Sequence, residues 1–184
     1  MNRQKFLLAV NFLNVFGFAL WGPLYSVYAT RQGANIAVVG ALFAGYTVID
    51  GLMILLFGRL TTPANRSKVL AAGYLTQGLG ALIFAMSSGV GGIAISLAVL
   101  ALGSGMIAPS WKALYTRTIE EVRSASLWSY YDAGNTFVIA AGSAIAGWIA
   151  FAFGFRPLFM LMAAVELLAA VAVLRVGYTE TKQL

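Results

Sequence analysis

Apolar residues run in long stretches along the chain, and short polar or turn segments separate these stretches. A stretch of about 20 apolar residues crosses the hydrocarbon core of a bilayer as a helix. Runs such as 92–102 lack the apolar and polar alternation that is typical of barrel strands. The pattern therefore predicts an all-α protein with six transmembrane helices, at about 6–29, 35–58, 67–87, 91–115, 126–152 and 157–176.

The composition supports a single membrane domain over residues 1–184. Hydrophobic residues make up 60% of the chain and charged residues only 10%, whereas soluble domains contain about 25% charged residues. The segments between the spans are too short for a separate soluble domain.

The chain contains neither cysteine nor histidine. This absence excludes disulfides, thiolate nucleophiles, Cys/His zinc sites and histidine bases. We therefore expect no enzymatic activity, no metal and no cofactor. The basic residues border the spans instead of forming one face, so we expect no nucleic-acid partner.

Positive charges are distributed unevenly between the two ends of the predicted spans. If the N-terminus is cytoplasmic, only Arg31 and Arg156 of the twelve Lys and Arg residues lie outside. The other ten are Arg3, Lys5, Arg59, Arg66, Lys68, Lys112, Arg117, Arg123, Arg175 and Lys182. This positive-inside bias predicts that both termini are cytoplasmic. We expect an integral protein of a bacterial or archaeal cytoplasmic membrane.

The first three spans share a sparse pattern with the last three. Segment 22–31 aligns with segment 108–117, and the rest aligns after a three-residue insertion. The aligned pairs include Pro23 with Pro109, Thr30 with Thr116, Arg31 with Arg117, Gly58 with Gly147, and Gln77 with Glu166. Because three helices reverse the direction of the chain, such a repeat is an inverted one.

The segment between the second and third spans, 58–68, reads GRLTTPANRSK. It resembles the Gly-x-Leu-x-Asp-Arg-x-Gly-Arg-Arg/Lys loop of the major facilitator superfamily, and the matching positions are Gly58, Leu60, Arg66 and Lys68. Thr62, Pro63 and Asn65 depart from that pattern, and Thr62 and Pro63 replace the Asp and the first Arg of the family's charge network. A second segment, 154–159, is similar to the Gly-Trp-Arg-x-x-Phe turn before a sixth or twelfth helix of the family.

The resemblance covers nearly the whole chain and implies one six-helix half of a transporter, built from inverted three-helix repeats. It implies a homodimer that joins two halves through their second and fifth helices. Small residues on the fifth span favour such close packing; they are Gly134, Ala140, Gly142, Ser143, Ala144, Ala146 and Gly147. The alternative is that these residues only pack helices within one chain.

Three acidic residues lie inside the predicted spans: Asp50, Asp132 and Glu166. Carboxylates in lipid are costly, so they usually face a cavity, pair with a base or stay protonated. Proton coupling or cation binding is one hypothesis. The alternatives are a gate in which Asp50 or Asp132 pairs with Lys112, and a neutral Glu166 that hydrogen-bonds Gln77.

The first span has polar and aromatic residues at spacings of three and four, hence on one face. The resemblance places its first and fourth helices along a central path. Our candidate substrate contacts are Asn14, Trp21, Tyr25, Tyr46 and Asn135. An interfacial aromatic belt is the alternative for Trp21 and Tyr25.

Two functions remain open from the sequence. The first is secondary active transport of a small organic solute by alternating access in a homodimer, with protons as a possible coupling ion. The second is a membrane substrate-binding or regulatory subunit that needs a partner chain, such as a component of an ATPase-driven vitamin importer.

Overall fold

The structure is a computed structural model that describes residues 3–118 and 124–180, and these residues form helices without strands. Six helical spans are long and apolar enough to cross a membrane. The elements are α1 (Arg3–Trp21), η1 (Gly22–Leu24), α2 (Tyr25–Arg31), α3 (Ile36–Leu60), α4 (Arg66–Met86), α5 (Gly89–Tyr115), η2 (Thr116–Thr118), α6 (Ser124–Ala152) and α7 (Phe155–Glu180).

These bounds agree with the predicted spans to within about one helical turn. The first span differs in one respect, because the 3₁₀ turn η1 separates α1 from α2. Pro23 lies in this turn and has no backbone N–H to donate to the helix. Pro109, its partner in the proposed repeat, lies inside α5, which continues to Tyr115.

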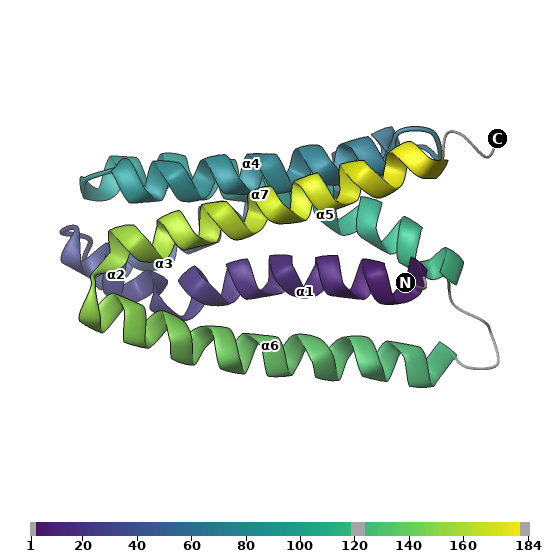
Figure 1. Cartoon of the computed structure of the whole chain (residues 1–184). Coiled ribbons are helices and arrows are strands. Elements are labelled where there is room, and N and C mark those ends of the chain that lie inside the picture. The colour runs from purple at the N-terminus through teal and green to yellow at the C-terminus, as the bar shows by residue number, and fades with distance from the viewer. Residues whose placement is uncertain (1–2, 119–123, 181–184) are drawn as a thin grey trace.

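Figure 1 shows that α1 begins and α7 ends at the same end of the bundle, as an even number of spans requires. Basic residues of the described chain gather at this end, at the starts of α1 and α4 and the ends of α3, α5 and α7. Arg123 and Lys182 lie outside the described residues. Arg31 and Arg156 lie at the opposite end, where α2 ends and α7 begins.

The helices differ in how much of their surface the chain itself covers. Helix α4 packs against α5 and α7, while α1 packs against α6 and α7. Helix α3 packs mainly on α5, so α3 and α6 are the two edge helices of the bundle. The most apolar stretch of α3 is 0% buried and that of α6 is 11% buried, against 39% to 50% for the other four spans.

The turns at the Arg31 end depend on backbone conformations that favour glycine. Gly33 and Gly154 have φ angles of 92° and 85°, in the left-handed region. Asn35 then caps α3, because its side chain accepts a hydrogen bond from the Val38 amide at 2.9 Å. These short connections hold the ends of neighbouring spans together.

Helices α4 and α5 approach closely at Gly103. A Cβ atom on Gly103 would lie 2.8 Å from the Gly73 carbonyl oxygen and 2.9 Å from the Gln77 amide nitrogen. Both atoms belong to the α4 backbone, so no side-chain rotation can relieve the overlap. Small residues that let backbones approach are a main source of helix association in membranes.

The same substitution at two glycines tests this contact. We expect Gly103→Ala to lower the free energy of unfolding by about 1–3 kcal/mol, because it overpacks the helix contact. Gly40→Ala is the matched control, since a Cβ at Gly40 meets nothing within 4 Å. That change should be neutral or stabilise α3 by up to about 1 kcal/mol through helix propensity.

Chemical unfolding in detergent, followed by far-UV circular dichroism, measures both effects. Equal effects of the two substitutions would contradict the close contact at Gly103.

Candidate functional site

One amide on α1 connects three helices in the middle of the bundle. The Asn14 amide nitrogen donates to Gln77 Oε1 on α4 at 2.6 Å. It also donates to the two carboxylate oxygens of Glu166 on α7, at 3.1 and 3.2 Å. Gln77 and Glu166, the pair that the proposed repeat aligns, therefore share one hydrogen-bond donor.

Glu166 is fully buried within the chain. Gly17 on α1 lies directly against its carboxylate, and Gly78 on α4 lies against its Cβ atom. Tyr74 is close enough to interact electrostatically with Glu166, and its hydroxyl is buried without a hydrogen-bond partner among the described residues. A larger residue at Gly17 would displace the carboxylate from Asn14.

A second amide pair joins α1 to α6. The buried Asn11 side chain donates to Asn135 Oδ1 at 2.7 Å. The two asparagines of α1 therefore serve different neighbours, since Asn14 binds α4 and α7 while Asn11 binds α6. Asn135, a candidate substrate contact, is already engaged by Asn11 in this conformation.

The three aromatic candidates, Trp21, Tyr25 and Tyr46, are buried and lie together. The Trp21 ring centroid is 5.5 Å from that of Tyr46 and 6.1 Å from that of Tyr25, both in edge-to-face geometry. The Tyr25 hydroxyl donates to the Val39 carbonyl at 3.0 Å. These contacts join α1 and α2 to α3 next to the turn at η1.

The charged candidates other than Glu166 lie nearer to the surface. Asp50 is half-buried beside Ser104 of α5 and Tyr46, and its Oδ1 atom has no hydrogen-bond partner among the described residues. Asp132 on α6 and Lys112 on α5 are exposed. In a helix that crosses a membrane, an exposed carboxylate such as Asp132 needs water or a further protein surface around it.

A comparison of the chain with protein families gives a match. The model described as Major Facilitator Superfamily matches residues 7–184. The chain belongs to the Major Facilitator Superfamily. Members of this superfamily are membrane transporters and not enzymes, so the chain is a membrane protein of a transporter family. No curated protein matches the chain.

The loop between α3 and α4, which resembles the superfamily motif, is closed by hydrogen bonds of its own. Asn65 Nδ2 donates to the Leu60 carbonyl at 3.0 Å, and Asn65 Oδ1 accepts from the Thr62 amide at 2.7 Å. Arg66 is buried, while Gly58 and Leu60 are exposed. Asn65, which replaces the family's second glycine, therefore closes the turn with its side chain.

Sequence reasoning missed several residues of this site. Gly17 and Ser104 carried no signal of their own, because glycine and serine are frequent in the spans. Asn11 belonged to the polar face of α1, but no periodicity argument identifies Asn135 as its partner. Gln77 was named through its alignment with Glu166 and as its hydrogen-bond partner, but in the structure both side chains accept from Asn14.

Replacement of Asn14 tests the three-helix network. We expect Asn14→Leu to lower the free energy of unfolding by about 2 kcal/mol, since it leaves buried acceptors on Gln77 and Glu166 without a donor. Glu166→Leu removes one of these acceptors, so the double variant should lose less stability than the two single changes together. A double-mutant cycle measures this coupling, which we expect to be about 1 kcal/mol; strictly additive losses would contradict the network.

Proposed function

We propose that this superfamily member is a half-size secondary transporter, in which two copies of the chain enclose one solute pathway and move a small organic solute by alternating access. The observation that supports this best is the pair of uncovered edge helices, α3 and α6. They are apolar, long enough to span a membrane and barely buried within the chain. A second copy related by a two-fold axis would cover both edges at once.

Helix α3 offers a surface for close helix packing. Gly51 and Gly58 lie one heptad apart, and a Cβ atom on either would meet nothing within 4 Å. The opposite face of α3 packs on α5, where Met53 lies against Gly105. The glycines on the free face therefore have no packing role within this chain.

The small residues of α6 divide between two faces. Gly134 lies against the Phe12 ring and Gly142 lies against Ala19, so both serve packing on α1 within the chain. Ala140 and Ala144 are exposed on the other face. Spaced by four residues, these alanines form a small-xxx-small pair that a second helix can approach. In the homodimer, this face of α6 meets α3 of the second copy.

The proposal includes an inverted repeat, and equivalent contacts support it. The alignment that pairs Gln77 with Glu166 also pairs Gly17 with Gly103, since Gly17 precedes Pro23 by the spacing at which Gly103 precedes Pro109. Gly17 lies against the Glu166 carboxylate, and a Cβ on Gly103 would lie 2.7 Å from Gln77 Cγ. The contact of α1 with α7 thus corresponds to the contact of α5 with α4.

A second pair of contacts follows the same rule. The alignment pairs Ala19 with Gly105 and Met53 with Gly142. A Cβ on Gly142 would lie 2.7 Å from Ala19 Cβ, and Gly105 lies against Met53. The packing of α1 on α6 thus matches the packing of α5 on α3. This is expected for two three-helix repeats that are related by an axis in the membrane plane.

The proposal assigns coupling to Asp132 and Asp50. Asp132 is exposed on α6, and Asp50 lies half-buried between α3 and α5. In the homodimer both carboxylates would lie near the seam between copies, where water from a solute pathway reaches them. A carboxylate that binds and releases protons there would couple solute movement to the proton gradient. The positive-inside pattern favours cytoplasmic termini.

The oligomeric state tests the proposed assembly. In native mass spectrometry we expect a dimer near twice the 19.5 kDa of one chain. Ala144→Phe should convert it to monomer, because a large ring prevents close approach of α6 to the second copy. Ala164→Phe on α7 is the matched control, since Ala164 is also exposed but lies outside both edge helices; it should leave the dimer intact.

A wild-type chain that remains monomeric at every concentration would contradict the homodimer. It would favour the alternative of a subunit completed by a different chain.

The coupling role is tested with liposomes that contain the protein and a trapped pH-sensitive dye. Organic cations such as ethidium and tetraphenylphosphonium serve as probe solutes, together with neutral solutes. We expect a solute gradient to move protons in the wild type, and Asp132→Asn to reduce this flux to that of protein-free liposomes. Asp132→Glu, which keeps the carboxylate, should restore part of it. Full proton flux in Asp132→Asn would exclude Asp132 as the coupling group.

A further inference from the structure

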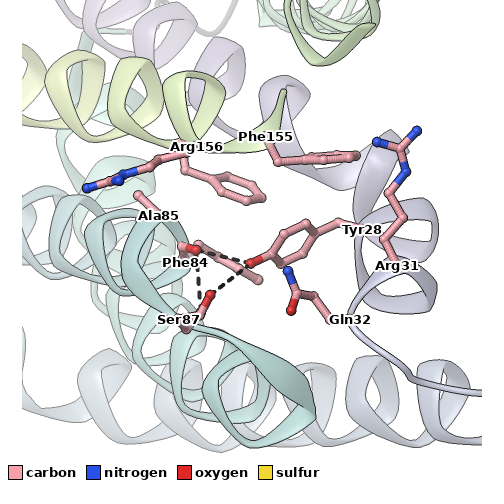
Figure 2. Close-up of a pocket in the computed structure, with 9 residues that line it drawn as sticks. Tyr28, Arg31, Gln32, Phe84, Ala85, Ser87, Phe155 and Arg156 are labelled. Carbon is pink, nitrogen blue, oxygen red and sulfur yellow. Dashed lines mark hydrogen bonds between the residues drawn. The ribbon is translucent and has the colours of Figure 1, made fainter. Parts of the chain in front are cut away.

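A small pocket lies at the end of the bundle opposite the chain termini. It has a volume of about 260 Å³ and lies where α2 and α4 end and α7 begins. Figure 2 shows Tyr28 at its centre, with Phe155 on one side and Gln32 on the other. The Tyr28 ring centroid is 5.1 Å from that of Phe155 and 4.9 Å from that of Phe159. We call this the Tyr28 pocket.

The charges around the Tyr28 pocket are all positive. Among the described residues, Arg31 and Arg156 line it and no acidic residue does so. These are the two arginines that the sequence separates from the other basic residues. The Arg31 guanidinium carbon lies 5.3 Å from the centroid of the Phe155 ring, which holds this charge over the pocket wall. Both arginine side chains are exposed and lie at opposite flanks of the pocket (Figure 2).

The Tyr28 and Ser87 hydroxyls donate within the protein, so the donors that the Tyr28 pocket offers a ligand come from Gln32 and the two arginines. The Tyr28 hydroxyl already donates to the Phe84 carbonyl at 3.2 Å. Gln32 Oε1 already accepts from the Gly89 amide at 2.9 Å, which leaves the amide nitrogen of Gln32 to donate. The pocket is also next to the N-terminus of α7, whose helix dipole favours negative charge. An anion with hydrogen-bond acceptors fits the two arginines, the Gln32 amide nitrogen and the start of α7.

The surroundings of the Tyr28 pocket favour a lipid over a soluble anion. The pocket lies at helix ends, which is the level of lipid headgroups when the spans cross a bilayer. Along the face of α7 that carries Arg156, a stripe of exposed apolar residues leads toward the middle of the span: Met160, Leu167, Val171 and Leu174. Acyl chains on this stripe would keep the attached phosphate within reach of the arginines.

We propose that the Tyr28 pocket binds the headgroup phosphate of an anionic phospholipid, with Arg31 and Arg156 as the charged contacts. The volume is below that of a typical small-molecule site of about 300–1,000 Å³, so it suits a headgroup better than a drug-sized solute. This site is separate from the solute pathway proposed above and independent of which end of the bundle is cytoplasmic.

Native mass spectrometry of the purified protein with added lipid tests the proposal. Phosphatidylglycerol and phosphatidylcholine with identical acyl chains serve as the anionic and zwitterionic probes. We expect the wild type to bind phosphatidylglycerol about tenfold more tightly at its first site, and Arg31→Gln with Arg156→Gln to abolish this preference. Arg59→Gln with Arg117→Gln removes the same charge from exposed positions at the other end and should keep it.

Two further arms make the result decisive. Arg31→Lys with Arg156→Lys keeps both charges and should retain the preference for phosphatidylglycerol. Together with loss of this preference in the glutamine variant, that result would support the charged contacts even if the glutamine variant is less stable. Inorganic phosphate is the soluble probe and should not displace the lipid at millimolar concentration. Equal binding of the two lipids by the wild type, an unchanged preference in the glutamine variant, or displacement by inorganic phosphate would each overturn the proposal.

Discussion

The hydrogen bonds of one amide, that of Asn14, determine how the central helices of this protein fit together. A polar group inside a bilayer has no water to bind, so each donor and acceptor must find a partner within the protein. Asn14 of α1 binds Gln77 of α4 and Glu166 of α7, and thereby fixes the rotation of three helices about their axes. Gly17 leaves room for the Glu166 carboxylate, and Gly78 leaves room for the Cβ atom of the same residue. The buried carboxyl is thus tolerated because its position is set by neighbours on two helices.

The bundle divides into an interior that the chain satisfies by itself and two edges that it leaves uncovered. Helices α1, α4, α5 and α7 bury aromatic and small residues against one another. Helices α3 and α6 each contact one side of this interior and expose the other. A transporter of the superfamily needs a pathway bounded on all sides, and the proposed second copy supplies the missing walls. The small residues of α6 follow the same division, since Gly134 and Gly142 pack on α1 while the exposed Ala140 and Ala144 are proposed to meet a second copy.

The sequence predicted the helices, the family and the distribution of charge well, because span length, hydropathy and loop chemistry are local properties. It predicted the residues of the site less completely, because partners on different helices depend on helix rotation. Asn14 and Trp21 share one face of α1, yet Asn14 binds Glu166 while Trp21 packs on Tyr46. Hydrophobic periodicity is a weak guide here, since both the interior and the lipid-facing side of the helices are apolar. The repeat aligned Gln77 with Glu166 but could not identify the donor between them.

A distance measurement between copies in a bilayer tests whether two copies of this chain form one transporter, as we propose. The chain contains no cysteine, so Ser26→Cys introduces one unique spin-label site at an exposed position on α2. Double electron–electron resonance detects a signal from a singly labelled chain only when a second label lies nearby. In nanodiscs loaded with dilute protein, we expect one defined distance between the labels of two copies. This signal should disappear when labelled protein is diluted with an excess of unlabelled chain before assembly. A dipolar signal absent under all conditions would contradict the proposal.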